Sequence, residues 1–145
     1  MSRILIIDDD EAIRMVYAEE LTQDGYEVIS TSDCSALPMI ITEYRPDVIL
    51  LDIRMGQYDG LEVLQDIRRA FYNLPVILCT AYSTFKYDLK SVAADYYVVK
   101  SADLEDLKFA ITMALGGTSS PMQEKVGRQR DKEHGRLDPY SVLLG

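Results

Sequence analysis

Five short runs of apolar residues recur along the chain, and each is bounded by residues that favour turns. Runs of about four to eight apolar residues with such boundaries are typical of buried strands. The expected strands cover residues 3–7, 26–30, 47–52, 76–80 and 96–99. The third run is the clearest, because it begins just after Pro46, is apolar from Val48 to Leu51 and ends on the carboxylate of Asp52.

Helical spacing of apolar residues fills the intervals between these runs. Ile13, Val16, Tyr17 and Leu21 form one apolar stripe, which predicts a helix over 10–24 that ends at Gly25. The other expected helices run from a cap at 33 or 35 to 44, from a cap at 59 to 71, over 84–94, and from 103 to the glycines at 116 and 117. Pro38 is compatible with the second helix because the first turn has no helical partners for its N–H groups.

Strands and helices therefore alternate five times. Each connection is long enough for a crossover between parallel strands, and such crossovers are right-handed. This pattern predicts an α/β domain with a doubly wound five-stranded parallel sheet between two layers of helices. Residues 1–116 form this domain, and residues 117–145 are either a linker or a native tail, with a helix expected over 121–134 because Pro121 and Glu124 resemble a helix start.

Polar residues stand where four of the predicted strands end. In a parallel sheet all carboxyl ends lie at one edge, so five side chains should converge there. They are Asp8, Asp9, Asp52, Thr80 and Lys100. Each has an ordinary structural explanation alone, as a helix cap, a strand end or a solvated charge, and their joint placement is what favours a functional site.

Three crowded carboxylates repel one another unless a cation joins them. Oxygen ligands with space for water and phosphate favour Mg²⁺ over Ca²⁺. A carboxylate beside such an ion can attack phosphorus and form an aspartyl phosphate. Lys100 could then pair with the phosphoryl oxygens and the Thr80 hydroxyl could donate a hydrogen bond to them.

Composition narrows the alternatives. The net charge of −9 argues against a site for the phosphate backbone of nucleic acids, which requires clustered basic residues. No apolar run approaches the roughly 18 residues of a membrane span, and no signal peptide is apparent, so a cytoplasmic protein is expected. Cys34 and Cys79 do not make a disulfide framework.

The motifs at these strand ends are similar to those of response-regulator receiver domains in two-component signalling. The matching stretches are Ile4-Leu5-Ile6-Ile7-Asp8-Asp9, Leu50-Leu51-Asp52-Ile53-Arg54-Met55, Asp59-Gly60, Leu78-Cys79-Thr80-Ala81 and Tyr97-Val98-Val99-Lys100. The resemblance covers about residues 3–115 and implies a flavodoxin-like sandwich with strand order 2-1-3-4-5.

The resemblance also implies roles for individual residues. Asp52 would accept a phosphoryl group from a histidine kinase or phosphotransfer protein. Mg²⁺ would be bound by Asp9, Asp52 and the backbone carbonyl of Arg54, with Asp8 assisting through water. Thr80 and Tyr97 would form the conformational switch.

Such a domain assists its own phosphorylation and dephosphorylation and is not otherwise an enzyme. The resemblance also implies homodimers through the face made by the helix expected over 84–94, the strand expected over 96–99 and the helix expected from 103.

Three departures from the family pattern affect these expectations. Gly56 replaces the usual proline in the loop after strand three, which predicts a looser loop. Ser101 replaces the usual proline after Lys100, which predicts a trans peptide bond there and a less firmly placed Lys100, since cis bonds before other residues cost about 2.5–4 kcal/mol. The stretch from Thr80 to Lys100 is also a residue or two short, so helix four is expected to be abbreviated.

Two other functions remain open at this point. In a haloacid-dehalogenase-type phosphatase, Asp8 would be the nucleophile and Asp10 the acid–base, although Glu11-Ala12 departs from the residues usual after that motif. A degenerate receiver would act as an interaction module without phosphorylation; the complete set of polar residues argues against it, and Ser101 argues for it.

Overall fold

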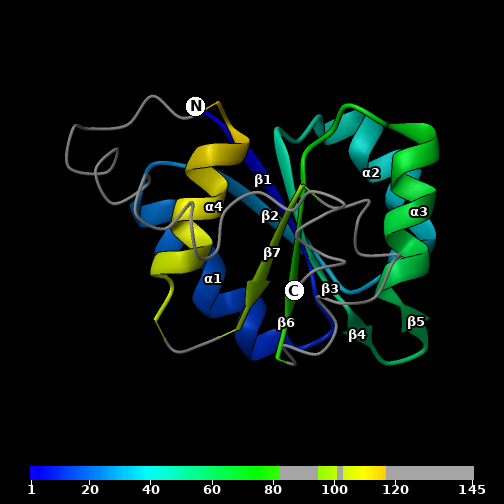
Figure 1. Cartoon of the computed structure of the whole chain (residues 1–145), viewed down its shortest axis with the longest axis horizontal. Helices are drawn as coiled ribbons and strands as arrows, with labels where there is room; N and C mark the ends of the chain where they lie inside the picture. The colour runs from blue at the N-terminus through cyan, green and yellow to red at the C-terminus, as the bar shows by residue number, and fades with distance from the viewer. Residues whose placement is uncertain (82–94, 101–102, 117–145) are drawn as a thin grey trace, which may run out of the picture.

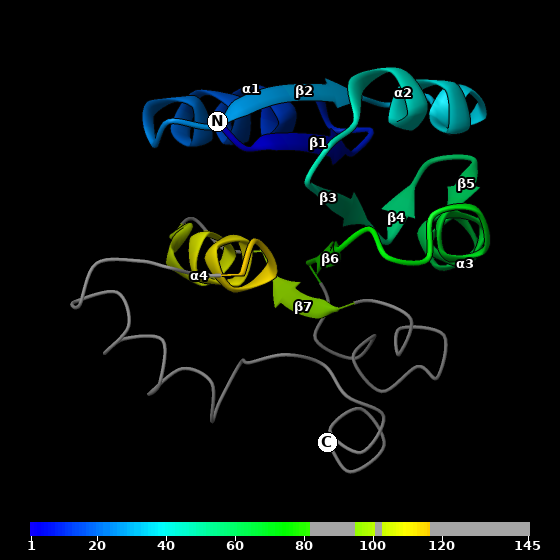
Figure 2. The same cartoon turned by 90° about the horizontal axis from the view of Figure 1, so that it is seen from above.

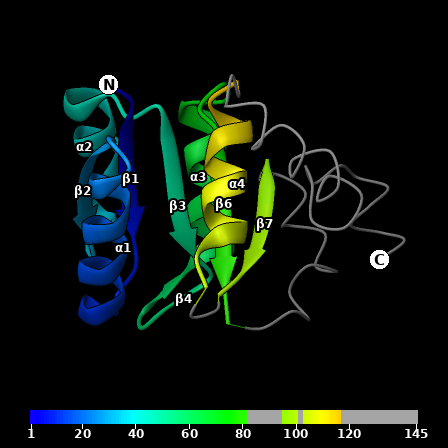
Figure 3. The same ribbon diagram turned by 90° about the vertical axis from the view of Figure 1, so that its left-hand side faces the viewer.

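The five apolar runs form one parallel sheet. In the computed structural model, which describes residues 1–81, 95–100 and 103–116, its strands are β1 (Arg3–Ile7), β2 (Glu27–Thr31), β3 (Val48–Asp52), β6 (Val76–Thr80) and β7 (Tyr96–Val99). Their order is β2-β1-β3-β6-β7 and every pairing is parallel. The predicted order 2-1-3-4-5 is confirmed, and Figure 3 shows the strands side by side with their carboxyl ends at the same edge.

Helices cover both faces of this sheet. They are α1 (Glu11–Gln23), α2 (Leu37–Tyr44), α3 (Gly60–Ala70) and α4 (Glu105–Ala114). α1 and α4 lie on one face and α2 and α3 on the other (Figures 1 and 2). None of the helices in these described ranges is long and apolar enough to cross a membrane.

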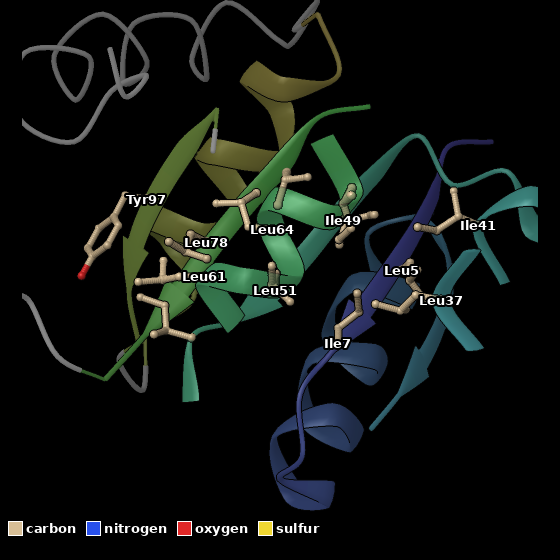
Figure 4. Packing of buried hydrophobic residues seen from close by; sticks show 13 residues of the cluster. Leu5, Ile7, Leu37, Ile41, Ile49, Leu51, Leu61, Leu64, Leu78 and Tyr97 are labelled. Atoms are coloured by element: carbon tan, nitrogen blue, oxygen red, sulfur yellow. The ribbon is translucent and has the colours of Figure 1, made fainter. Parts of the chain in front are cut away.

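Each face of the sheet has its own hydrophobic core. Leu5, Ile49 and Leu51 point to the α2/α3 side, where they pack with Leu37 and Leu64 (Figure 4). Their neighbours along the strands point to the α1/α4 side, where the core includes Ile4, Ile6, Leu50, Leu21 and Ile111. The alternation explains why the strands are apolar throughout, because both sides of the pleat are buried.

Local capping sets the helix ends. The Asp10 carboxylate accepts hydrogen bonds from the backbone of Ala12 and Ile13 and so begins α1, which ends before Gly25 at φ +97°. Asp59 caps α3 in the same way through the backbone N–H of Leu61, as predicted.

Several element boundaries differ from the sequence-based expectation by one or more residues. Strand β2 begins one residue later than predicted, since the N–H of Tyr26 is bonded to Leu21 O at the end of α1. The second helix begins with a 3₁₀ turn, Cys34–Ala36, that Asp33 caps, and α2 proper starts at Leu37. α4 starts at Glu105 and not at 103, because the Asp103 carboxylate binds the N–H of Glu105 in a turn ahead of the helix.

The structure also contains a small hairpin after β3 that the sequence pattern did not predict. β4 (Arg54–Met55) and β5 (Tyr58–Asp59) pair antiparallel and form a separate two-stranded sheet. Two-residue strands have no periodicity that a sequence pattern could reveal. Some predictions lie wholly or partly outside the described residues. They are the helices over 84–94 and 121–134, the Lys100–Ser101 bond, and the dimer face that includes the helix over 84–94.

An ion-pair network fastens the sheet edge opposite the carboxyl ends. The Arg68 guanidinium, on α3, donates to Tyr72 O at 3.0 Å and Leu74 O at 2.6 Å and also pairs with the Asp95 carboxylate. Asp95 in turn accepts the N–H of Val76 at 2.8 Å. Arg68 therefore joins the end of α3 to the starts of β6 and β7.

Candidate functional site

Three carboxylates meet at the carboxyl edge of the sheet. Asp8 and Asp9 follow β1 and Asp52 ends β3, and one oxygen of each lies within 4.8 Å of the others. Asp8 and Asp52 are buried, at 2% and 7% exposure, while Asp9 is exposed. Pairing of β1 with β3 in parallel register brings the residues together, so the predicted convergence of the three acids is confirmed.

Lys100 brings a positive charge to this cluster. Its Nζ lies 2.7 Å from Asp8 Oδ2 and 3.2 Å from Asp52 Oδ1, and only 14% of its side chain is exposed. Burial acts to lower the pKa of Lys100, but the hydrogen bond to Asp8 and the charge of Asp52 outweigh burial and raise the pKa above its usual value. The expectation that Lys100 would be loosely placed is not supported by these distances.

Asp8 is itself held by the turn between β1 and α1. Its Oδ1 accepts the N–H of Asp10 at 2.9 Å, its own N–H donates to Thr31 O at 3.1 Å, and its carbonyl accepts Arg14 Nη1 at 2.6 Å. The role of Arg14 was not predicted from the sequence. A cation near a helix N-terminus opposes the helix dipole, and this mismatch was the signal that could have drawn attention to it.

Thr80 and Tyr97 lie on the neighbouring strands. The Thr80 carbonyl accepts the N–H of Lys100 at 2.6 Å, which couples the end of β6 to the lysine, and the Thr80 side chain is 1% exposed. Tyr97 is 7% exposed and belongs to the core on the α2/α3 side, at the margin of the cluster in Figure 4. Tyr97 and Lys100 thus occupy opposite faces, as the spacing of three residues predicts.

The hairpin after β3 returns the chain to the site. Ile53 N–H donates to Cys79 O at 3.2 Å, and Gly60 N–H donates to Ile53 O at 2.8 Å. A Cβ on Gly60 would lie 2.2 Å from Asp52 O, so only glycine permits this close approach. Arg54, whose carbonyl is the predicted third metal ligand, begins β4 two residues after Asp52, and its ligand role stays a prediction.

Two neutral polar side chains lie near Asp8, Asp52 and Lys100. Tyr17, from α1, is 7% exposed and Cys79, from β6, is 4% exposed. Burial raises the pKa of the Tyr17 phenol and of the Cys79 thiol to about 12 each, and the nearby carboxylates Asp8 and Asp52 add to the effect while Lys100 opposes it. Both groups therefore stay protonated near neutral pH, and Cys79 is not a reactive thiol.

The donor set fits a hard divalent cation. The three residues provide carboxylate oxygens, which suit Mg²⁺, and Lys100 pairs with two of the three carboxylates. The phosphatase alternative fits less well. The Asp10 carboxylate is used as the cap of α1, and both Asp8 oxygens already accept hydrogen bonds, from Asp10 N–H and Lys100.

Comparisons with known proteins agree with this geometry. Residues 4–112 match the family model of the response regulator receiver domain. The chain is 32% identical over 117 residues to regulatory protein AtoC of Escherichia coli (strain K12), a match covering 79% of this chain and 25% of AtoC. It is 30% identical over 115 residues to sporulation initiation phosphotransferase F of Bacillus subtilis (strain 168), covering 78% of this chain and 93% of that protein.

Solved structures show the same architecture. Response regulator TrrA of Thermotoga maritima in complex with Mg²⁺-BeF superimposes with a TM-score of 0.76 at 39% identity, over 79% of this chain and 100% of the other. In the complex of histidine kinase ThkA with TrrA, the matched chain gives a TM-score of 0.74 at 38% identity, over 79% of this chain and 99% of the other.

The extent of these matches differs between relatives. The chain spans about a quarter of AtoC and about half of the Mycobacterium response regulator MprA, with shares of 25% and 52%, but nearly all of the sporulation phosphotransferase. The family match covers the sheet, the acidic cluster and Lys100. The chain therefore belongs to the response regulator receiver domains of two-component signalling.

Proposed function

We propose that the domain accepts a phosphoryl group on Asp52 from the phosphohistidine of a histidine kinase or phosphotransfer protein. The observation that carries the proposal is the position of Asp52 at the buried end of the central strand, 3.2 Å from Lys100 Nζ and within the acidic cluster. The named partner of TrrA, a histidine kinase, supports a kinase as the donor.

The reaction is a displacement at phosphorus. An Asp52 carboxylate oxygen forms the new P–O bond while the P–N bond of the phosphohistidine breaks, and the electron pair of that bond stays with the imidazole. Lys100 moves its charge toward the transferred oxygens, and the Thr80 hydroxyl donates a hydrogen bond to one of them. Lys100 is already beside Asp52, so the group that neutralises the product is in place before transfer.

Asp9, Asp52 and the carbonyl of Arg54 would hold Mg²⁺, with Asp8 assisting through water. When bound, the ion supplies positive charge against the phosphoryl oxygens. The Thr80 hydroxyl is then drawn toward the phosphoryl group. Tyr97, on the same face of the sheet as Thr80, responds by favouring its inward conformation, as a shift between pre-existing states.

Phosphorylation of the purified chain tests the proposal. Phosphoramidate with Mg²⁺ should add one phosphoryl group, measured by intact mass, and the addition should be lost with EDTA and in Asp52→Asn. Asp66→Asn serves as the matched control, because Asp66 lies on an exposed face of α3 in a surface pair with Arg69. A label that maps to Asp8 would favour the phosphatase alternative, and a chain that takes no label would favour the degenerate receiver.

A further inference from the structure

The turn of the β4–β5 hairpin lies against one of the acidic residues. Gly56, in this turn, has φ +53°, in the left-handed region that favours glycine. A Cβ on Gly56 would lie 3.3 Å from Asp9 Oδ2, closer than ordinary van der Waals contact. The other two glycines with positive φ in the described ranges, Gly25 and Gly116, have no atom within 4 Å of such a Cβ.

Contacts at the base of the hairpin hold this turn in place. Gly60 packs on Asp52 O at one end, and the Ile53 N–H is bonded to Cys79 O at the other. Tyr58 packs against the α2/α3 core, and its hydroxyl donates to Asp33 Oδ1 at 3.4 Å. The hairpin is thus held at its base and along β5, and its turn lies next to the exposed Asp9 carboxylate.

We propose that Gly56 is a positioning residue: by having no side chain, it lets the turn close on Asp9 and hold that carboxylate at the spacing a small cation requires. The inference rests on the proposed function, in that it takes Asp9 as a ligand of Mg²⁺. Gly56 is thereby the residue that makes the cluster selective for Mg²⁺ over Ca²⁺.

The selectivity follows from the different demands of the two ions. Mg²⁺ requires near-octahedral oxygen ligands at about 2.0–2.1 Å, whereas Ca²⁺ accepts more ligands at about 2.3–2.6 Å in flexible arrangements. Asp9 is at the surface and can give way by a few tenths of an ångström without unfolding anything. Displacement of Asp9 should therefore have a small effect on the stability of the fold and a large effect on the affinity for Mg²⁺, the smaller ion.

Three variants separate contact with Asp9 from backbone strain. Gly56→Ala introduces both the Cβ contact and the cost of a positive φ. Gly56→Asn keeps the Cβ but tolerates the left-handed region better than alanine. Gly25→Ala introduces strain alone, because its Cβ meets open space. Binding of MgCl₂ and of CaCl₂ to each protein is measured by titration calorimetry, and the melting temperature of the metal-free protein is measured alongside.

The expected result is a loss of Mg²⁺ affinity of about tenfold in both Gly56 variants, the size typical when a metal ligand loses its support. Ca²⁺ affinity should change less, so the ratio of the two affinities falls. Gly25→Ala should melt at a lower temperature and bind both ions like the parent chain.

Several outcomes would overturn the inference. Unchanged Mg²⁺ affinity in Gly56→Asn, an equal loss for both ions, or the same loss in Gly25→Ala would each show that contact with Asp9 does not set selectivity. A parent chain that binds no Mg²⁺ would instead remove the proposed function on which the inference rests.

Discussion

Lys100 places one positive charge among three negative ones. It pairs with Asp8 and Asp52 in a space that is nearly closed to water, where charges are costly unless they are paired and hydrogen-bonded. No ion pair to Asp9 occurs within the ranges 1–81, 95–100 and 103–116. The excess negative charge of the cluster therefore lies on Asp9, the most exposed of the three carboxylates. Contact with water makes that unpaired charge tolerable there.

The raised pKa of the single residue Tyr17 predicts a measurable pH dependence of the unfolding free energy. Because burial raises its pKa from 10.0 to about 12, the neutral phenol stabilises the folded state below pH 10, and this contribution is lost as the pH rises toward 12. Tyr17→Phe removes the titrating group while keeping the ring. Between pH 10 and 12 we expect the parent chain to lose about 2 kcal/mol more unfolding free energy than the variant does.

Denaturant unfolding at a series of pH values measures the difference. Lys100, whose raised pKa also implies loss of stability at high pH, is present in both proteins and cancels. Tyr72→Phe is the matched control, since Tyr72 is 74% exposed and should behave like the parent chain. Parallel curves for the parent chain and Tyr17→Phe would contradict the prediction.

The helices are held at their ends as well as by packing along their lengths. α1 begins at the Asp10 cap, α3 begins at the Asp59 cap, and the far end of α3 is fastened through Arg68 to the starts of two strands. Arg68 and Asp95 are 19% and 28% exposed, so their interaction is only partly screened by solvent. The network therefore contributes to the position of α3 and not only to surface charge.

Arg68→Met tests this role. The change leaves the carbonyls of Tyr72 and Leu74 without their donor, although Asp95 keeps the Val76 N–H, and we expect a loss of about 2 kcal/mol in unfolding free energy. Arg69→Met is the neighbouring control: its pair with Asp66 is over 70% exposed on each side, and about 0.5 kcal/mol or less is expected. Equal losses from the two variants would refute a special role for Arg68.

Sequence patterns located the large elements and missed the small ones for physical reasons. The four strands that end at the site were predicted almost to the residue, because buried runs are bounded by proline, acids and turns. The β4–β5 hairpin has no periodicity, and the start of α4 was misplaced because Asp103 caps a turn and not the helix. Long-range contacts such as Arg14 with the Asp8 carbonyl depend on packing that no local pattern encodes.

At the scale of the whole molecule, the negative charge and the site coincide. The chain carries a net charge of −9, and its three-carboxylate cluster adds repulsion at one edge of the sheet. A divalent ion that binds only the folded protein stabilises it by mass action. Magnesium should therefore act on global stability and not only on chemistry.

Melting curves in MgCl₂ and in NaCl of equal ionic strength measure this effect. At about one hundred times the dissociation constant, Mg²⁺ should add about 2.7 kcal/mol, a rise of several degrees in melting temperature beyond that in NaCl. Asp9→Asn removes a repelling charge and a ligand at once. It should melt higher than the parent chain without metal and respond to both salts alike, whereas a magnesium response equal to the parent's would show that Asp9 is not a ligand.

Successive residues along each strand enter opposite cores, and this alternation limits which sequence changes the chain can accept. Asp8, Asp52 and Lys100 continue the alternation of the residues that enter the α1/α4 core, while Thr80 continues that of the α2/α3 core, to which Tyr97 belongs. The site thus depends on the parity of residue positions within each strand. One residue inserted or deleted inside β3 would exchange the faces and carry Asp52 away from Lys100. Substitutions can retune the chemistry, but changes of length are confined to the loops.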